Sequence, residues 1–474
     1  MNLVPVTTSK MEAHDDKNND KVPQVGFLNS LKYGALYFTI YLAGIFTFLA
    51  IIADPATMST YFSDNSLLPG LVNREFSLLT ETEYYLKDLE KLVNSVKIND
   101  QDKSIATQPQ VVNFIKRELE NFGLDPPEQN FSFRQHDKQY NGTNIYSIIT
   151  GERSTSSESI VLCAPIRKDA KTDTLSGIAL TLSLANYFSS KSYWAKDVVI
   201  VFVDHGEFGL SAWLDSYYDV NFRSNLKGTR EDAYHEPLEE RSGPMQAAII
   251  LELSGRKFSR VNVKIQGKYG QLPNLDLFNL VIEMAARESV TPYFHNKSLP
   301  FDLSAIDLYE HHLETAISFM KTQATMQSDG LHGQFLEYAV QSLTLEATGV
   351  EASKSNKNLI TASLLNIGRL VEGVFRSLNN LTERFNRSYY FYIILSLRRF
   401  TSIAYYMAAF GLIVAPLLLR AYIIHQDRCL HNKPISFRTI ILLAATLVLS
   451  IVSTFNISLA IMTSVVTVPI LFTL

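Results

Sequence analysis

Acidic side chains stand at or just beyond the ends of three apolar segments that predict β-strands. The segments are SIVLCAP (159–165), DVVIVFVD (197–204) and MQAAIILELS (245–254). Asp173 and Glu207 follow the first two segments, and Glu252 lies near the end of the third. Open α/β sheets place their sites at the carboxyl ends of strands. Three carboxylates without a histidine suit Mg²⁺ or Ca²⁺ better than Zn²⁺, so the pattern predicts at most a weak site for a hard divalent ion.

The order of these segments resembles the co-catalytic zinc aminopeptidase family. In that family a strand ends in His-x-Asp, an Asp precedes Ser-Gly and a helix, a Glu-Glu pair precedes x-Gly-Leu, and a later strand ends in Asp. The resemblance places Asp173 at the metal-bridging aspartate, Glu207 at the second glutamate of the pair and Glu252 at the later aspartate. It implies an α/β domain whose mainly parallel sheet is flanked by helices.

The sequence departs from that family at the residues that perform its chemistry. Pro165 and Arg167 stand where His-x-Asp belongs, and Gly206 replaces the general-base glutamate. Asp169 and His332 are further polar candidates near this face, but neither completes a ligand set. A hydrolytic zinc site needs enclosing ligands, an open position for water and a base. We therefore predict no catalytic residue and no intrinsic activity.

A different interpretation gives the three carboxylates structural roles without a metal. Asp173 would cap a helix, Glu207 would face solvent in the first turn of a helix, and Glu252 would pair locally. Two further interpretations are a bound Mg²⁺ or Ca²⁺ ion and a working metallo-aminopeptidase. Metal analysis of the purified domain distinguishes the three.

The region between residues 54 and 386 alternates short β-branched segments with segments of helical periodicity. This alternation predicts an α/β domain with a mainly parallel sheet. The net charge is −4 and no basic stripe occurs, which argues against a nucleic-acid partner. Cys163 and Cys429 are predicted on opposite sides of a membrane, so the core rather than a disulfide must stabilise the domain.

Uncharged apolar blocks on either side of this region predict membrane helices. A signal anchor is favoured over a cleaved signal peptide because a long polar tail precedes the first block and no small-x-small site follows it. The predicted organisation is a disordered cytosolic tail (1–33), a transmembrane signal anchor (34–52), a lumenal aminopeptidase-like domain (54–386), an interfacial segment with a second transmembrane helix (389–424), a cytosolic loop (425–438) and one or more further membrane-spanning segments, apparently truncated (439–474).

Glycosylation sequons support a lumenal location for the central domain. Asn130, Asn141 and Asn296 each begin an Asn-x-Ser/Thr sequence and are predicted to be glycosylated. Asn456 also begins such a sequence, but it lies in an apolar run and is predicted to be inaccessible.

Several longer segments resemble a narrower family, the glycosylphosphatidylinositol (GPI) anchor attachment proteins, which are the aminopeptidase-like subunits of GPI transamidase. The segments are TYFSDNSLLPG (60–70), GTNIYSI (142–148), SYWAKDVVIVFVDHGEFGLSAWLDSYYDV (192–220), QAAIILELS (246–254), GQLPNLDLFNL (270–280), LVEGVFRSLNNLTERFNRSYYFYIILSLRRFTSIAYYM (370–407) and FNISLAIMTSVVTVP (455–469). They occur in the family's order.

The resemblance implies a non-catalytic subunit of a complex in the endoplasmic reticulum membrane. The complex removes a C-terminal signal peptide from precursor proteins and joins the new carboxyl end to GPI. The implied partners are the other transamidase subunits, including a caspase-like catalytic subunit, together with the GPI lipid, the precursor proteins and the membrane. An active lumenal aminopeptidase and a pure assembly scaffold stay open as competing functions.

GPI must be bound where chain segments leave the membrane, because its acyl chains stay in the bilayer. The resemblance places GPI contacts at Tyr61 and Ser63, after the first span, and at Asn386, Arg387 and Ser388, before the second. An arginine can bind a phosphate through paired donors, while hydroxyl and amide groups can bind sugars. Alternatively, Asn386 is only a glycosylation acceptor and Arg387 an interfacial anchor.

Overall fold

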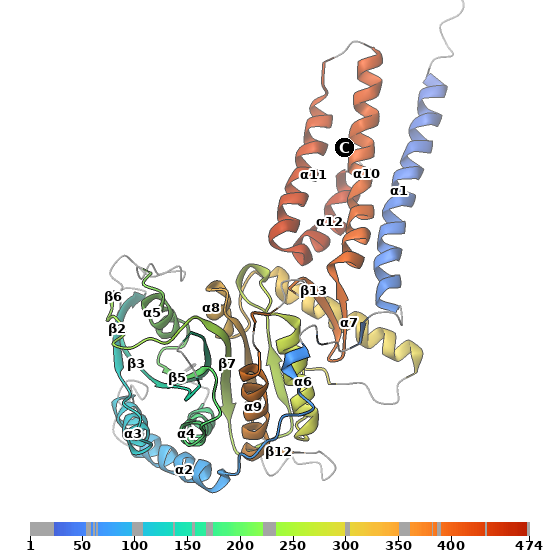
Figure 1. Cartoon of the computed structure of the whole chain (residues 1–474). Coiled ribbons are helices and arrows are strands. Elements are labelled where there is room, and N and C mark those ends of the chain that lie inside the picture. Colours follow the sequence, from blue (N-terminus) through green and yellow to red (C-terminus); the bar gives the residue numbers. More distant parts are fainter. Residues whose placement is uncertain are drawn as a thin grey trace, which may run out of the picture. The chain divides into compact units, whose positions relative to one another are not determined.

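The described chain consists of two units. The computed structural model describes residues 23–53, 58–59, 62, 65–96, 108–135, 138–153, 157–166, 174–220, 234–298, 304–349, 361–381, 383–385, 390–431 and 434–471. The helical unit comprises Met1–Thr47, Ala408–Val448 and Ser464–Leu474, and the α/β unit comprises Phe48–Met407 and Leu449–Thr463. Figure 1 shows the elements of both.

Within the described residues, nine strands form the large sheet of the α/β unit, in the order β10-β9-β11-β7-β4-β5-β3-β2-β6. Their bounds are β2 Glu128–Gln135, β3 Lys138–Ile149, β4 Ser159–Pro165, β5 Asp197–Val203, β6 Tyr234–His235, β7 Met245–Ser254, β9 Val261–Lys264, β10 Pro292–Tyr293 and β11 Gln341–Thr348. The central strands β11, β7, β4 and β5 are parallel. Antiparallel pairs flank them. The predicted mainly parallel sheet is confirmed.

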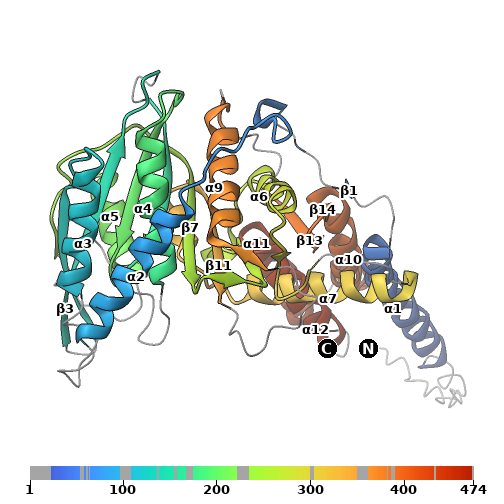
Figure 2. The ribbon, with the colours of Figure 1, turned by 90° about the horizontal axis from the view of Figure 1, so that it is seen from below.

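Helices cover both faces of this sheet. On one face lie α2 (Leu79–Val96), α3 (Gln108–Asn121), α4 (Leu175–Ser189), α6 (Leu275–Arg287) and α9 (Leu364–Asn379), and on the other lie α5 (Glu207–Tyr217) and α8 (His332–Glu337). Figure 2 shows the first layer in front of the strands. Every residue of β4 and β5 is buried because both faces are covered, which explains their continuous apolar sequence.

A close approach between α4 and β7 explains the Ser-Gly pair that opens α4. A Cβ atom added at Gly177 would lie 2.6 Å from the carbonyl oxygen of Leu251. Any larger side chain would push the helix away from the strand, so glycine lets α4 pack directly on the sheet.

A second, smaller sheet is built from strands that are next to apolar helices in the sequence: β1 follows the first of these helices, and β14 precedes the second. It has the order β1 (Met58–Ser59), β14 (Arg399–Ser402), β13 (Tyr392–Ser396). The buried strand β13 packs against α7 (Ala305–Ala324). The remaining elements are the pair β8 (Lys257–Phe258) and β12 (Ala362–Ser363) and the short 3₁₀ helices Asn65–Leu67 and Lys268–Gly270.

The apolar blocks of the sequence form long helices: α1 (Pro23–Ala53), α10 (Ile403–Leu430), α11 (Phe437–Phe455) and α12 (Ile457–Leu471). Among the described residues, Tyr33–Ala53, Ile403–Leu430 and Phe437–Phe455 are long and apolar enough to span a membrane, and α12 is a shorter apolar helix. The last apolar run thus divides at Asn456. Predicted boundaries between cytosolic and lumenal parts stay predictions.

Candidate functional site

The predicted lipid-binding residues are Tyr61, Ser63, Asn386, Arg387 and Ser388. All five lie outside the described residues. What the structure defines is the framework on either side of them in the sequence.

Described strands that flank these residues in the sequence belong to one sheet. Strand β1 ends at Ser59, and β13 begins at Tyr392. Both pair with β14, Ser59 opposite Arg399 and Tyr392 opposite Ser402. Helix α10 starts at Ile403, directly after β14. The sheet therefore joins the segment that follows the first apolar helix to the segment that precedes the second.

Helix α7 contacts two further chain segments within the α/β unit. The Tyr309 hydroxyl donates to the carbonyl oxygen of Leu49, at the end of α1, over 3.4 Å. At the other end of α7, the Asn456 amide donates to the Gln323 carbonyl oxygen over 2.6 Å, and the Ser458 hydroxyl donates to the Gln323 side chain. Because α7 also supports β13, it braces the small sheet and the α11–α12 junction together.

A buried histidine on α7 predicts acid sensitivity. His312 is 4% exposed. Burial, followed by the nearby Arg399 and His311, lowers the pKa of its imidazole to about 4. Above pH 6.5 both folded and unfolded chains hold it neutral, and as the pH falls below that value the unfolded chain gains a proton first. The contribution of neutral His312 to the free energy of unfolding is therefore complete above pH 6.5 and is lost as the pH falls towards 4.

We expect His312 alone to lower the free energy of unfolding by up to about 3 kcal/mol between pH 7 and pH 4. The measurement is urea unfolding of the full chain in detergent, followed by tryptophan fluorescence. Both tryptophans, Trp194 and Trp213, are buried in the α/β unit. The variant His312→Gln should show a flatter pH profile, and an unchanged profile contradicts this assignment.

Near the carboxyl end of β7, Glu252 has a cation beside it. It lies on β7 and is 3% exposed. The Lys264 ammonium is 4.0 Å from Glu252 Oε2 and 2.7 Å from Glu346 Oε1. The two glutamates face each other on the parallel strands β7 and β11. An ammonium between two carboxylates supplies the positive charge that a metal ion would supply.

The other predicted ligands do not join Glu252 in a described cluster. Asp173 lies outside the described residues, and the N-cap position of α4 is occupied by Thr174. Glu207 is the first residue of α5, where a carboxylate is favoured by the helix dipole. His332 is fully buried, with Nδ1 3.0 Å from the Thr344 hydroxyl.

The described residues near the ends of β4, β5 and β7 provide few side chains that could bind a divalent metal ion. Among the described residues, no three His, Cys, Asp or Glu side chains are grouped to hold one. Gly206, which was expected at the general-base position, has no side chain to accept a proton. Cys163 is fully buried in β4, and burial raises the pKa of its thiol, so it stays protonated.

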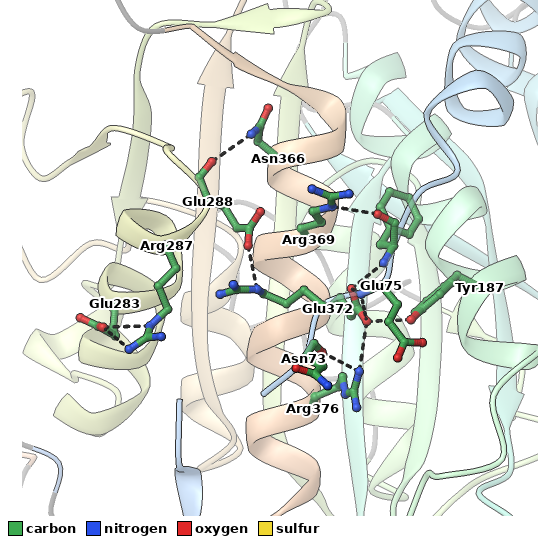
Figure 3. A network of polar contacts seen from close by, with 12 residues as sticks. Asn73, Glu75, Tyr187, Glu283, Arg287, Glu288, Asn366, Arg369, Glu372 and Arg376 are labelled. Carbon is green, nitrogen blue, oxygen red and sulfur yellow. Dashed lines mark hydrogen bonds and ion pairs between the residues drawn. The ribbon is translucent and has the colours of Figure 1, made fainter. Parts of the chain in front are cut away.

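A buried carboxylate that sequence analysis missed ties the segment after the 3₁₀ helix Asn65–Leu67 to the α/β unit. Glu372, on α9, is fully buried. It accepts hydrogen bonds from the backbone N–H groups of Glu75 and Phe76 at 2.8–2.9 Å and from the Tyr187 hydroxyl at 2.7 Å. Figure 3 shows Glu75 and Tyr187 on either side of the Glu372 carboxylate, with their hydrogen bonds dashed. Because Arg376 lies 3.5 Å away, the charge also has a cationic partner.

Three arginines extend this network, and Figure 3 labels two of them, Arg369 and Arg376. Arg369 donates to the Phe76 carbonyl oxygen over 3.0 Å, and Arg376 donates to the carbonyl oxygen of Asn73. Arg74 forms a 2.7 Å ion pair with Glu288 at the end of α6. We call the contacts of Asn73–Phe76 with α6, α9 and Tyr187 the α9 clamp. The only sequence signal for it was a glutamate in an otherwise apolar face of a helix.

The sequons differ in exposure. Asn130, Asn141 and Asn296 are exposed on the α/β unit, as glycosylation requires. Asn456 is 2% exposed, and its side-chain oxygen accepts from the N–H of Leu459 in the first turn of α12. Its burial is as predicted, but the cause is hydrogen bonding at a helix junction.

Comparisons of sequence identify relatives. Residues 141–436 match the family described as Gaa1-like, GPI transamidase component. The GPI transamidase component gaa1 of Schizosaccharomyces pombe is 30% identical over 382 residues, which are 80% of this chain and 62% of that protein. The corresponding component of Saccharomyces cerevisiae is 27% identical over 378 residues, 77% of this chain and 54% of that protein. The chain therefore spans between about half and three fifths of these relatives.

Solved structures with a related shape are enzymes. Fimbriiglobus ruber glutaminyl cyclase is 12% identical, with 65% of this chain and 98% of that one covered at a TM-score of 0.41. A leucine aminopeptidase precursor from Bacteroides thetaiotaomicron is 13% identical, with 64% and 99% covered at 0.40. A zinc aminopeptidase from Bacillus subtilis is 10% identical, with 64% and 96% covered at 0.40. The strand order and helix layers above define the fold independently of these likenesses.

Proposed function

Because the chain belongs to the Gaa1-like family of GPI transamidase components, we propose that it is a non-catalytic subunit that holds GPI beside the membrane for attachment to precursor proteins. The α/β unit is then lumenal, in the endoplasmic reticulum, and the partners are the other subunits, including a caspase-like catalytic one. Holding the lipid and the precursor in register accelerates their reaction by proximity.

The observation that carries this proposal is the sheet β1-β14-β13. It connects the segment that leads to Tyr61 and Ser63 with the one that follows Asn386, Arg387 and Ser388. Both adjoin helices apolar enough to span a membrane. A lipid with its acyl chains in a bilayer presents its phosphate and glycan to such segments, whereas Glu252, at the strand ends, has a lysine beside its carboxylate.

The proposal is tested by crosslinking a photoreactive GPI analogue to the full chain in its complex. Arg387→Ala, alone and with Tyr61→Ala and Ser63→Ala, should lower the yield about tenfold. A charge-assisted phosphate contact is worth about 1.5–3 kcal/mol, and salt screens part of it. The yield is normalised to the complex recovered.

The matched control is Glu252→Ala with Asp173→Ala, which should leave lipid crosslinking near the normal yield. If the variant at Glu252 and Asp173 loses crosslinking while the variants at Arg387, Tyr61 and Ser63 keep it, the proposed site is contradicted. If every variant assembles and none crosslinks less, the chain acts as a scaffold.

A further inference from the structure

A groove of about 530 Å³ runs between α3 and the outer face of strands β2, β3 and β6. It belongs to none of the sites described above. Its strand side is formed by polar and aromatic residues: Asn130, Ser132, Asn141, Thr143 and Tyr234. Two of these, Asn130 and Asn141, are the first residues of glycosylation sequons.

Three groove residues form a row across the strands. Ser132 on β2 pairs with Asn141 on β3 and with Tyr234 on β6. Paired residues of neighbouring strands point to the same face and the strands are about 5 Å apart, so Asn141 and Tyr234 are about 10 Å apart with Ser132 between them. The serine is small and the Tyr234 ring is 60% exposed. The row is therefore a hollow with an amide at one end and an aromatic ring at the other.

A second row forms a polar wall beside this hollow. The Thr143 hydroxyl donates to Asn130 Oδ1 over 2.9 Å, and Asn130 Nδ2 donates to Glu236 Oε2 over 3.0 Å. The Asn130 backbone N–H also donates to Glu236 Oε2. These bonds engage both the oxygen and the nitrogen of the Asn130 amide, so in this inference Asn130 stays unglycosylated, and its amide and the Glu236 carboxylate are held in place to bind hydroxyl and acetamido groups.

We propose that the groove binds the first N-acetylglucosamine of the chain's own glycan, attached at Asn141. In this modification Asn141 Nδ2 forms a bond to C1 of the sugar. A lipid diphosphate leaves with the electron pair of the broken C1–O bond, and one amide proton is lost. The inference rests on the lumenal location in the proposed function, where the lipid-linked oligosaccharide is the donor.

The row geometry explains why a sugar suits this place. A pyranose ring linked to Asn141 Nδ2 extends over Ser132 and brings its apolar C–H face against the Tyr234 ring, which removes both from water. Its polar edge then meets Asn130 and Glu236. A glycan seated here also covers β2, which is paired on its outer side only by the two-residue strand β6 among the described residues. That protects an edge that would otherwise be open to other chains.

The glycan-bearing face then cannot be an interface with another subunit of the complex. Contacts with partners must lie elsewhere on the α/β unit.

The test is hydroxyl-radical footprinting of Tyr234 on the full chain in its complex, carrying high-mannose glycans. Endoglycosidase H removes all but one N-acetylglucosamine, so Tyr234 should stay protected after this digestion. The variant Asn141→Gln removes the sugar entirely and should raise the oxidation rate of Tyr234 several-fold. Unchanged fluorescence of the buried tryptophans shows that the variant is folded. The control Asn296→Gln loses a glycan elsewhere and should leave Tyr234 protected.

Glycopeptide masses separate the failure of this inference from that of the proposed function. A glycan at Asn130, or one at Asn296 without one at Asn141, overturns the inference alone, as does equal oxidation of Tyr234 in Asn141→Gln and the parent. Absence of glycan from Asn130, Asn141 and Asn296 together overturns the lumenal location, and with it both proposals.

Discussion

Replacing Glu372 by alanine is expected to lower the free energy of unfolding of the α/β unit by about 3–4 kcal/mol. The change leaves the N–H groups of Glu75 and Phe76 and the Tyr187 hydroxyl without their acceptor in a buried place. It also leaves Arg376 without the carboxylate beside it. Removing one member of a buried charged network costs more than the network's net contribution, because its partners stay desolvated.

The effect is measured by urea unfolding in detergent with tryptophan fluorescence. Glu372→Gln keeps the shape and one acceptor oxygen, so it should cost less than alanine. The matched control is Glu283→Ala, which breaks the more exposed 2.9 Å pair with Arg287 and should cost less than about 1 kcal/mol. Equal losses for Glu372→Ala and Glu283→Ala contradict the role given to the α9 clamp.

A second consequence concerns Gly368, one turn before Glu372. A Cβ atom there would lie 2.3 Å from the ring of Phe76, which the clamp holds against α9. The clamp therefore depends both on the carboxylate and on the absence of a side chain at Gly368, and neither requirement is visible in local sequence patterns.

The central strands could be predicted from the sequence because the signal for each of them, a run of apolar residues, lies within the strand itself. Strands β4, β5 and β7 are buried on both faces, so each contains a run of consecutive apolar residues, which in β7 is interrupted only at Gln246 and Glu252. A helix such as α9 shows apolar periodicity for a different reason, because it packs one side on the α/β unit. The apolar helices were predictable because their composition alone defines them.

The contacts that organise the candidate sites could not be predicted, because their partners are far apart in the sequence. Glu372 binds backbone groups nearly 300 residues earlier. Strand β1 has only two residues, too few for a periodic signal. Asn456 looked like part of a span, since only the distant Gln323 explains why an asparagine interrupts it. Hydrogen bonds between residues far apart in the sequence produce no periodic pattern of apolar residues from which they could be predicted.

Replacing Lys264 by methionine is expected to destabilise the α/β unit by about 3 kcal/mol and to make its stability depend on divalent cations. In the native chain the ammonium lies 4.0 Å from Glu252 and 2.7 Å from Glu346, which face each other on adjacent strands. Methionine keeps the apolar stem but leaves two carboxylates repelling each other, one of them buried.

A hard divalent ion is the natural replacement for the lost charge, because carboxylate oxygens are its preferred ligands. Millimolar Ca²⁺ or Mg²⁺ should therefore restore part of the lost stability in Lys264→Met and leave the parent chain unchanged. The measurement is the urea midpoint with the ion or with a chelator. Lys264→Arg keeps the charge and should show little cation dependence.

Lys268→Met is the matched control, because it breaks a 2.6 Å pair with Glu337, a residue that is itself exposed. It should cost less and show no cation effect. If Lys264→Met is as stable as the parent chain and added cations do not change its stability, the Lys264 ammonium does not replace a metal ion beside Glu252 and Glu346. If the parent chain itself gains stability from Ca²⁺, an ion binds beside the lysine, and the ligands predicted at Asp173, Glu207 and Glu252 then become the residues to replace.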